Sequence, residues 1–142
     1  MNEQKVFQLV YVSSAVNQKP LTDIHEILKV AVNTNAQLGI TGALLFHAGY
    51  FLQLLEGDEI QVRELYEKIK TDKRHNNVIT LIETNTNPRI YSKWAMAFKE
   101  MSEQDLRMVN NIMSWTKLII KSPDVDHKLI LKIMENFKKE LT

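Results

Sequence analysis

The stretch TGALLFHAGYFLQLLEG, residues Thr41–Gly57, joins two apolar runs through a short segment that contains glycine. The runs Ala43–Phe46 and Phe51–Leu55 flank Ala48-Gly49, which is the pattern of a β-hairpin. Side chains alternate between the two faces of a strand, so Gln53 shares its face with apolar neighbours. A buried amide without partners costs about 1–3 kcal/mol. The sequence therefore predicts a hydrogen-bond partner for Gln53 on that face.

Length and composition favour one ordinary domain. With 142 residues, 44% of them apolar, the chain can bury a substantial core. Its 18 basic residues nearly balance its 17 acidic ones without a long run of one sign, so we expect neither nucleic acid nor a membrane as partner. Cysteine is absent, which excludes disulfides and thiolate metal sites. The start MNEQK lacks the apolar segment of a signal peptide, and we expect a cytoplasmic location.

The segment before the hairpin predicts one strand and one helix. Val6–Ser13 is rich in β-branched and aromatic residues, which is typical of a strand inside a sheet. Pro20–Thr34 carries apolar residues at helical spacing and predicts an amphipathic helix. Asn33-Thr34-Asn35 and Gly39 should end this helix, because Asn and Gly both tolerate the left-handed backbone of helix ends.

The segment after the hairpin repeats this alternation. Asp58 can cap a second helix that runs to about Asp72. Val78–Glu83 predicts a fourth strand, and Trp94–Phe98 a short fifth one after a proline-containing loop. The order strand, helix, strand, strand, helix, strand, strand favours an α+β fold of ferredoxin-like type. We expect a mixed sheet of about five strands with both helices on one face.

The last forty or so residues predict a helical hairpin, since Ser102 and Ser122-Pro123 can each begin a helix. We therefore divide the chain into a first domain of residues 1–100 and a helical extension of residues 101–142. The extension should pack on the open face of the sheet, which would otherwise expose apolar side chains to water. Its apolar stripes exceed what one sheet face needs, so we also expect contacts with a second subunit.

Motifs for hydrolysis, metal binding and phosphate binding are missing. The four histidines are scattered without an HExxH or paired spacing, so no metal site is expected. Neither a P-loop nor a dinucleotide fingerprint can be written through the four glycines.

Four separated segments instead resemble the BLUF family, small blue-light sensors that hold FAD. They are VYVSSA in the first strand, NAQLGITGALLFHAGYFLQLLEG, IKTDKRHNNV and the late WAM, and they agree with the family in order and spacing. The resemblance runs from about Val6 to Phe98. It implies a blue-light photoreceptor that is not an enzyme, with FAD, or else FMN or riboflavin, as chromophore. The helical pair after Ser102 resembles the extension of short stand-alone members, which implies output to a downstream protein partner and a homo-oligomer.

The resemblance also assigns roles to individual residues. Tyr11 would be the redox-active phenol and Gln53 the switching amide beside the flavin ring. Either Trp94 or Met96 would lie near that amide. The cofactor-binding residues that it implies are Ile24, Thr34, Asn35, Gln53, Ile69, Asp72, Arg74 and His75. Among these, Asn35 would hold the ring edge, Ile24 and Ile69 would sandwich the ring, and Arg74 and His75 would meet the ribityl phosphate side. Thr34 stands where many members have His or Asn.

The pattern alone also fits simpler roles for these residues. Tyr11 on an apolar strand is usually a core aromatic, and Asn35 is usually a helix stop. Polar residues such as Arg74 after a helix most often form a solvated loop. Two other functions fit the same fold: a small hydrolase in the manner of acylphosphatases, or a flavin-free interaction module. A yellow purified protein would separate the sensor from both.

Overall fold

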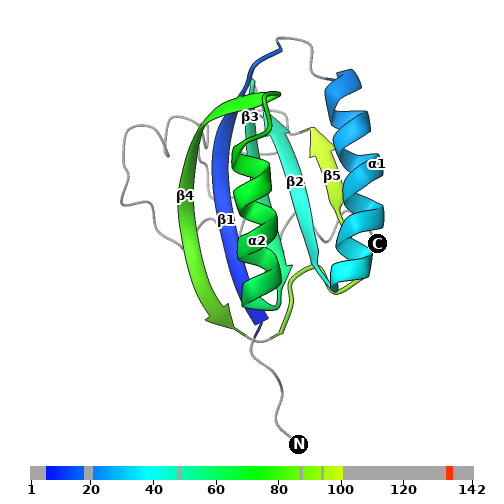
Figure 1. Ribbon diagram of the computed structural model, residues 1–142, viewed down its shortest axis with the longest axis vertical. Helices are drawn as coiled ribbons and strands as arrows, with labels where there is room; N and C mark the ends of the chain where they lie inside the picture. Colours follow the sequence, from blue (N-terminus) through cyan, green and yellow to red (C-terminus); the bar gives the residue numbers. More distant parts are fainter. Residues whose placement is uncertain are drawn as a thin grey trace, which may run out of the picture.

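The structure is a computed structural model that describes residues 6–17, 21–47, 49–86, 88–93, 95–100 and 134–135. Its elements are, in order, β1 (Val6–Ala15), α1 (Leu21–Leu38), β2 (Thr41–His47), β3 (Tyr50–Gly57), α2 (Glu59–Lys70), β4 (His75–Thr86) and β5 (Ala97–Glu100) (Figure 1). The predicted order of strands and helices is confirmed. The predicted helices of the C-terminal extension lie outside the described residues, apart from Met134 and Glu135.

The strands form one mixed sheet in the order β4-β1-β3-β2-β5. Neighbouring strands are antiparallel except β2 and β5, which are parallel. Both helices lie on the same face of the sheet, α2 over the strands β1 and β3 and α1 towards β2 and β5 (Figure 1). The predicted ferredoxin-like α+β fold with two helices on one face is therefore confirmed. Among the described residues, no helix is long and apolar enough to cross a membrane.

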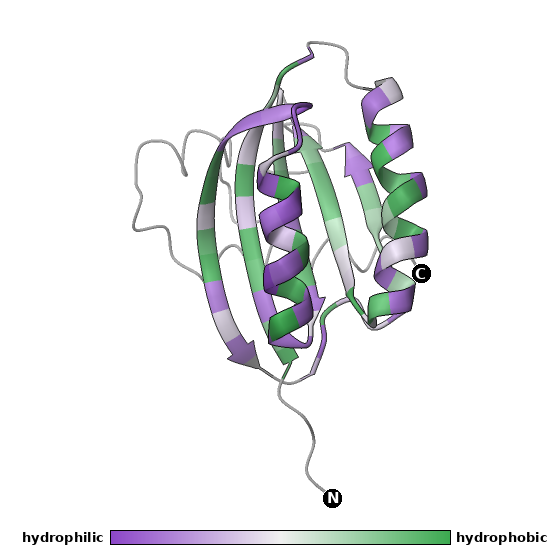
Figure 2. Cartoon of the chain, in the orientation of Figure 1, coloured by the Kyte–Doolittle hydropathy of each residue, from purple (hydrophilic) through white to green (hydrophobic). Residues whose placement is uncertain are grey.

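The two faces of the sheet bury separate apolar clusters. The helix-covered face holds Phe7, Leu9, Tyr11, Ile24, Ile40, Leu44, Phe46, Phe51, Leu55, Val62, Tyr66 and Met96. The opposite face, which we call the second face, holds Val10, Val12, Ala43, Leu45, Leu52, Leu54, Ile82, Ile90, Tyr91, Ala97 and Met134. Figure 2 shows the consequence on α2, whose outward side is largely hydrophilic while the strands behind it are mostly hydrophobic. Met134 thus packs on the face where the C-terminal extension was predicted to lie.

The end of α1 differs from the prediction. The helix continues through Asn33-Thr34-Asn35 to Leu38 and ends at Gly39, which has a φ of 69°. Asn tolerates the left-handed backbone but does not require it, whereas Gly adopts it without strain, so the helix ends at the glycine. The predicted stop at Gly39 is confirmed, whereas the predicted helix end at Thr34 was wrong by about one helical turn. The longer helix keeps Asn35 in its last turn, where its side chain is buried against the sheet with 1% exposure.

The start of α2 is as predicted, whereas the bounds of β4 and β5 differ from the prediction by a few residues. Asp58 caps α2 as predicted, since its Oδ2 accepts from Gln61 N–H at 3.2 Å. The fourth strand is longer than Val78–Glu83, because polar residues at both ends of β4 also pair with β1. The short fifth strand begins at Ala97, and Trp94 lies outside the described residues.

Candidate functional site

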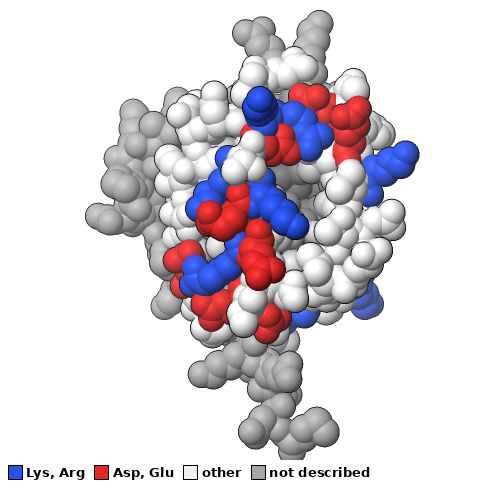
Figure 3. Space-filling view, viewed as in Figure 1, with Lys and Arg blue, Asp and Glu red and all other residues white. Residues whose placement is uncertain are grey.

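A cavity of about 350 Å³ lies between the two helices and the sheet. Its lining residues are Tyr11, Ile27, Val30, Ala31, Thr34, Asn35, Leu44, Phe51, Gln53, Leu65, Lys68, Ile69, Asp72, Arg74 and His75. This volume lies within the range of about 300–1,000 Å³ that is usual for small-molecule sites. Figure 3 shows the surface hollowed between the charged outer side of α2 and the mostly uncharged α1.

The walls of the cavity are apolar and come from both helices. Ile27, Val30 and Ala31 lie at helical spacing on α1, while Leu65 and Ile69 are four residues apart on α2. Residues three or four apart share one side of a helix, so each helix presents a continuous apolar strip to the space. Two such strips facing each other suit a flat aromatic group, which they would contact on both sides.

The floor of the cavity carries a chain of polar side chains. Tyr11 of β1 and Gln53 of β3 are direct partners in the sheet register. The Tyr11 hydroxyl donates to Gln53 Oε1, and Gln53 Nε2 donates to Met96 Sδ at 3.4 Å. Tyr11 and Gln53 are 3% and 5% exposed. The predicted partner of Gln53 on its face of the sheet is therefore Tyr11, and Met96 provides a weaker second one because a thioether is a poor acceptor.

Burial controls the protonation of Tyr11. Loss of water around the phenol, together with the nearby Tyr66 and Asp72, raises the pKa of Tyr11 far above its ordinary value of about 10. The phenol therefore keeps its proton at neutral pH. Oxidation changes this, because a tyrosine that loses an electron becomes a strong acid. Since the hydroxyl points at Gln53 Oε1, the proton has an acceptor already in place.

Asn35 is one of the residues that line the cavity. Its Nδ2 donates to the carbonyl of Ala95 at 3.1 Å, next to Met96 in sequence. Its Oδ1 has no hydrogen-bond partner within the part of the chain that the structure describes. A buried acceptor without a partner is costly, and a ligand with an N–H group in the cavity would supply one.

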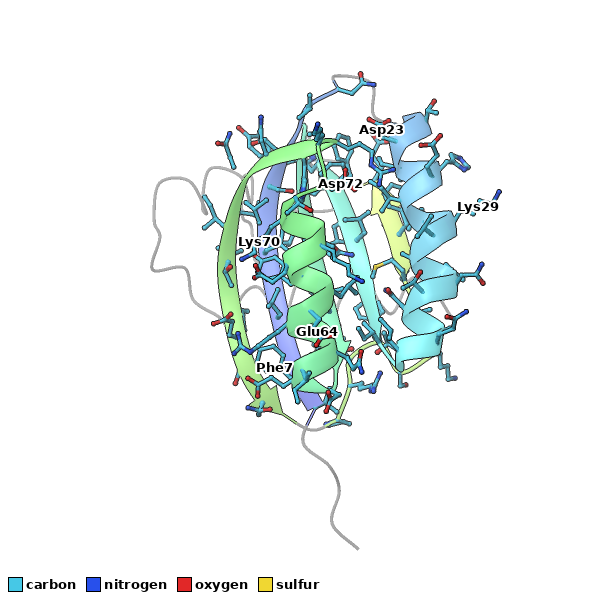
Figure 4. All side chains as sticks on the ribbon, in the orientation of Figure 1. Phe7, Asp23, Lys29, Glu64, Lys70 and Asp72 are labelled. Carbon is cyan, nitrogen blue, oxygen red and sulfur yellow. The ribbon has the colours of Figure 1, made fainter. Side chains whose placement is uncertain are left out.

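One end of the cavity is charged. Two nitrogens of Arg74 donate hydrogen bonds to the Asp72 carboxylate: Nε to Oδ1 at 2.9 Å and Nη2 to Oδ2 at 2.5 Å. These hydrogen bonds from Arg74 lower the pKa of Asp72. Nη1 of Arg74 lies 3.7 Å from Glu26 Oε2, so the guanidinium also approaches α1. In Figure 4, Asp72 and Asp23 lie at this same end of the two helices. An anion at Arg74 would share the guanidinium with Asp72.

His75 makes hydrogen bonds with both ring nitrogens. Nδ1 lies 2.7 Å from Ser13 Oγ, and Nε2 lies 2.6 Å from the carbonyl of Ile69. Because a carbonyl only accepts, Nε2 carries the hydrogen and Nδ1 can accept from the serine hydroxyl. The imidazole thus joins the end of α2 to β1 while its ring lines the cavity.

The cavity brings together most of the residues that the sequence singled out. Ile24 is buried in the apolar cluster of the helix-covered face but does not line the cavity. Met96 does not line it either, and contacts the site by accepting the hydrogen bond from Gln53 Nε2. The remaining lining residues were not predicted from the sequence as part of a site: Ile27, Val30, Ala31, Leu44, Phe51, Leu65 and Lys68. The apolar ones follow the same helix and strand periodicity as core residues, so periodicity could identify them as inward but not as a cavity wall.

Known proteins are similar to this chain in sequence and in fold. Residues 6–97 match the family described as "BLUF: Sensors of blue-light using FAD". The photoactivated adenylate cyclase subunit beta of Euglena longa is 38% identical over 89 residues, which are 62% of this chain and 10% of that protein. The blue light- and temperature-regulated antirepressor BluF of Escherichia coli (strain K12) is 38% identical over 88 residues, 62% of this chain and 22% of that protein.

The dark-state structure of BlrB, a BLUF protein, has a similar fold, with a TM-score of 0.78 and 24% identity over 96% of this chain and 97% of that one. The curated relatives are longer, and this chain spans about a tenth to a fifth of their length. What each of them shares with this chain is a segment of 89 or 88 residues. The match over residues 6–97 and the shared fold show that the chain belongs to the BLUF family, the sensors of blue light using FAD.

Proposed function

We propose that this protein senses blue light with FAD bound in the cavity between α1 and α2, and that the Gln53 amide is its switch. The observation that carries the proposal is the hydrogen-bonded chain from Tyr11 through Gln53 to Met96 at the floor of the cavity. A flavin absorbs blue light, and when excited it supplies a strong oxidant.

The residues of the cavity fit this cofactor. The facing strips of α1 and α2 would contact both sides of its ring system, with Ile69 in one of them. The Oδ1 of Asn35, which has no partner among the described residues, would accept from a ring N–H, and Thr34 precedes Asn35 in the cavity lining. Arg74 and Lys68 would offer positive charge to the phosphates, with Asp72 fixing the position of the guanidinium. His75 would hold that end of α2 in place.

Tyr11 would act as the donor of an electron and a proton. The electron would pass from the phenol to the excited flavin in the cavity, and the proton would move along the existing hydrogen bond to Gln53 Oε1. Both return to Tyr11 when the electron comes back. Because the unoxidised phenol does not ionise near neutral pH, proton transfer is tied to electron transfer.

Gln53 would then change which groups it bonds. An amide carries an acceptor at one end and two donors at the other, so a half-turn exchanges the groups that face Tyr11 and Met96. The bond from Gln53 Nε2 to the Met96 sulfur is long and weak, so giving it up costs little. After the half-turn, Nε2 would donate to the Tyr11 hydroxyl and the amide oxygen would face Met96. The polar surroundings of the cavity change although no strand has moved.

Gln53→Leu tests this proposal. Leucine has a similar size and no polar atoms, and such a substitution in a core usually costs under about 1.5 kcal/mol. The purified variant should bind FAD, yet its absorption band should neither shift under blue light nor recover in darkness. Gln8→Leu is the matched control for the presence of the shift, not for its rate of recovery: Gln8 is a buried glutamine on the second face whose partner is Glu56, and this variant should keep the shift. A normal shift in Gln53→Leu would refute the role of this amide.

Output would pass through the extension of residues 101–142 to a downstream protein or a second copy of the chain. Support comes from Met134, which packs in the apolar cluster of the second face and accepts from the Tyr91 hydroxyl at 2.6 Å. Truncation after Glu100 should leave FAD binding and the light-induced shift intact but change the oligomeric state, measured by light scattering. Loss of FAD from the truncated protein would contradict this division into two domains.

A further inference from the structure

The segment before β5, which the structure describes at residues 88–93 and 95–96, crosses from one face of the sheet to the other. Ile90 and Tyr91 belong to the apolar cluster of the second face, whereas Met96 belongs to that of the helix-covered face. Met96 immediately precedes Ala97, the first residue of β5 that pairs with β2. Since β5 is a strand of only four residues at the edge of the sheet, the crossing segment itself must help to fix Met96.

On the second face, Glu56 of β3 anchors this segment. Its side chain is 0% exposed. Oε2 accepts from Ile90 N–H at 2.7 Å and Oε1 from Tyr91 N–H at 2.8 Å, while Gln8 Nε2 donates to Oε2 at 2.7 Å. Each oxygen therefore binds at least one donor. Hydrogen bonds from N–H groups to a carboxylate are about twice as strong as those between neutral groups.

Arg89, the residue before Ile90, also bonds to the sheet and helps to hold this segment in place. Arg89 Nη1 donates to Thr41 Oγ1 at 3.1 Å and approaches the carbonyl oxygen of Glu56 at 3.4 Å. Three successive residues, Arg89 to Tyr91, are thus attached to β2 and β3. On the helix-covered face the segment is attached once more, through Asn35 Nδ2 and the carbonyl of Ala95.

We infer that Glu56 is a positioning residue for the switch. By holding Ile90 and Tyr91 on the second face, it sets how closely Met96 packs against the Gln53 amide on the other face. The inference rests on the proposed function of Gln53. Gln53 and Glu56 are three residues apart on one strand and point to opposite faces, so β3 carries both the amide that rearranges and the carboxylate that fixes its neighbour.

The consequence concerns the return of the switch in darkness. With FAD filling the cavity, the site would be closely packed, and the amide could turn only if Met96 gave way. Glu56→Gln replaces one acceptor oxygen by an NH₂ group that faces N–H donors, so at least one anchoring bond is lost and the segment loosens. The amide should then turn back more easily, and the light-shifted band should decay faster.

A double-mutant cycle on the full chain bound to FAD tests this. The rate of dark recovery is measured in the wild type, Glu56→Gln, Met96→Leu and the double variant. Glu56→Gln should speed recovery about fivefold or more in the wild-type background and less than about twofold in the Met96→Leu background, because coupled residues do not act additively. Glu83→Gln is the matched control, an exposed carboxylate on β4, and should leave recovery unchanged.

Each outcome bears on the inference. An equal change of rate in both backgrounds, or none in either, would overturn it. If Glu56→Gln does not fold, Glu56→Asp replaces it in the same cycle with the same expectation, because aspartate keeps both oxygens but shortens the reach to Ile90 and Tyr91. A wild-type protein that binds FAD without a reversible shift refutes the proposed switch itself, and the role of Glu56 with it.

Discussion

The two faces of the sheet differ in how they treat buried polar groups. On the second face, both oxygens of Glu56 are occupied by donors, and apolar side chains pack around them. On the helix-covered face, the partners of Gln53 among the described residues are Tyr11 and, more weakly, Met96, beside a cavity of about 350 Å³. A fully bonded group in a packed core stays where it is, whereas a partly bonded group beside open volume can rearrange. We therefore call the second face the fixed face and the helix-covered face the adaptable face.

The largest expected effect is on the adaptable face. Tyr11→Phe should fold and bind FAD but lose its light response completely, because phenylalanine has no hydroxyl proton and is much harder to oxidise. Absorption spectra before, during and after blue illumination measure this. Tyr66→Phe is the matched control, since the Tyr66 ring lies 5.3 Å from that of Tyr11 while its hydroxyl bonds Thr80 instead of Gln53. A full reversible shift in Tyr11→Phe would show that the response does not depend on the Tyr11 hydroxyl, and the helix-covered face would then not owe its response to this polar pair.

An intermediate effect should distinguish the packing of the two faces. Leu54 is 0% exposed on the second face, and Leu54→Ala should lower the free energy of unfolding by about 4 kcal/mol. Leu44 lines the cavity, so Leu44→Ala removes fewer contacts and should cost about 2 kcal/mol in the absence of FAD. Urea unfolding of both FAD-free variants measures the difference. Equal costs would mean that the cavity-bearing face is packed as tightly as the other.

The smallest effect should come from the charged end of the cavity. Arg74 lowers the pKa of Asp72, so this pair adds stability above the ordinary aspartate pKa of about 3.9, and the stability is lost as the pH falls through the lowered value. Asp72→Asn should therefore cost no more than about 1 kcal/mol at pH 7, as is usual for a partly exposed pair. Its difference from the wild type should shrink in acid. Urea unfolding from neutral to acidic pH would show it, and a difference that persists unchanged in acid would contradict the assignment.

The sequence predicted the adaptable face better than the fixed one. Alternation along Thr41–Gly57 placed Gln53 among apolar side chains and required a partner for it, and the family resemblance directed attention to Tyr11. The partners of Glu56 were not predicted, because Ile90 and Tyr91 follow it by more than thirty residues and contribute only backbone N–H groups, which every residue has.

At the end of α1, the local sequence pattern predicted a helix end that lies too early. Asn33-Thr34-Asn35 has the residues of a helix end, but the continuing helix places the Asn35 amide against the carbonyl of Ala95, a contact with a residue sixty positions away. Tertiary contacts of this kind override a residue's local preference. The role of Trp94 stays a prediction, since this residue lies outside the described part of the chain.

The register of the sheet limits which insertions and deletions this chain can accept. β1 and β3 pair without interruption from Phe7 with Gly57 to Ser14 with Tyr50, while the pairing of β1 with β4 contains two irregularities. One residue added to β3 ahead of Gln53 would either turn the amide to the second face or slide it away from Tyr11. β4, at the edge, already absorbs such irregularities. Length variants should therefore be tolerated in β4 long before they are tolerated in the two strands that carry the switch.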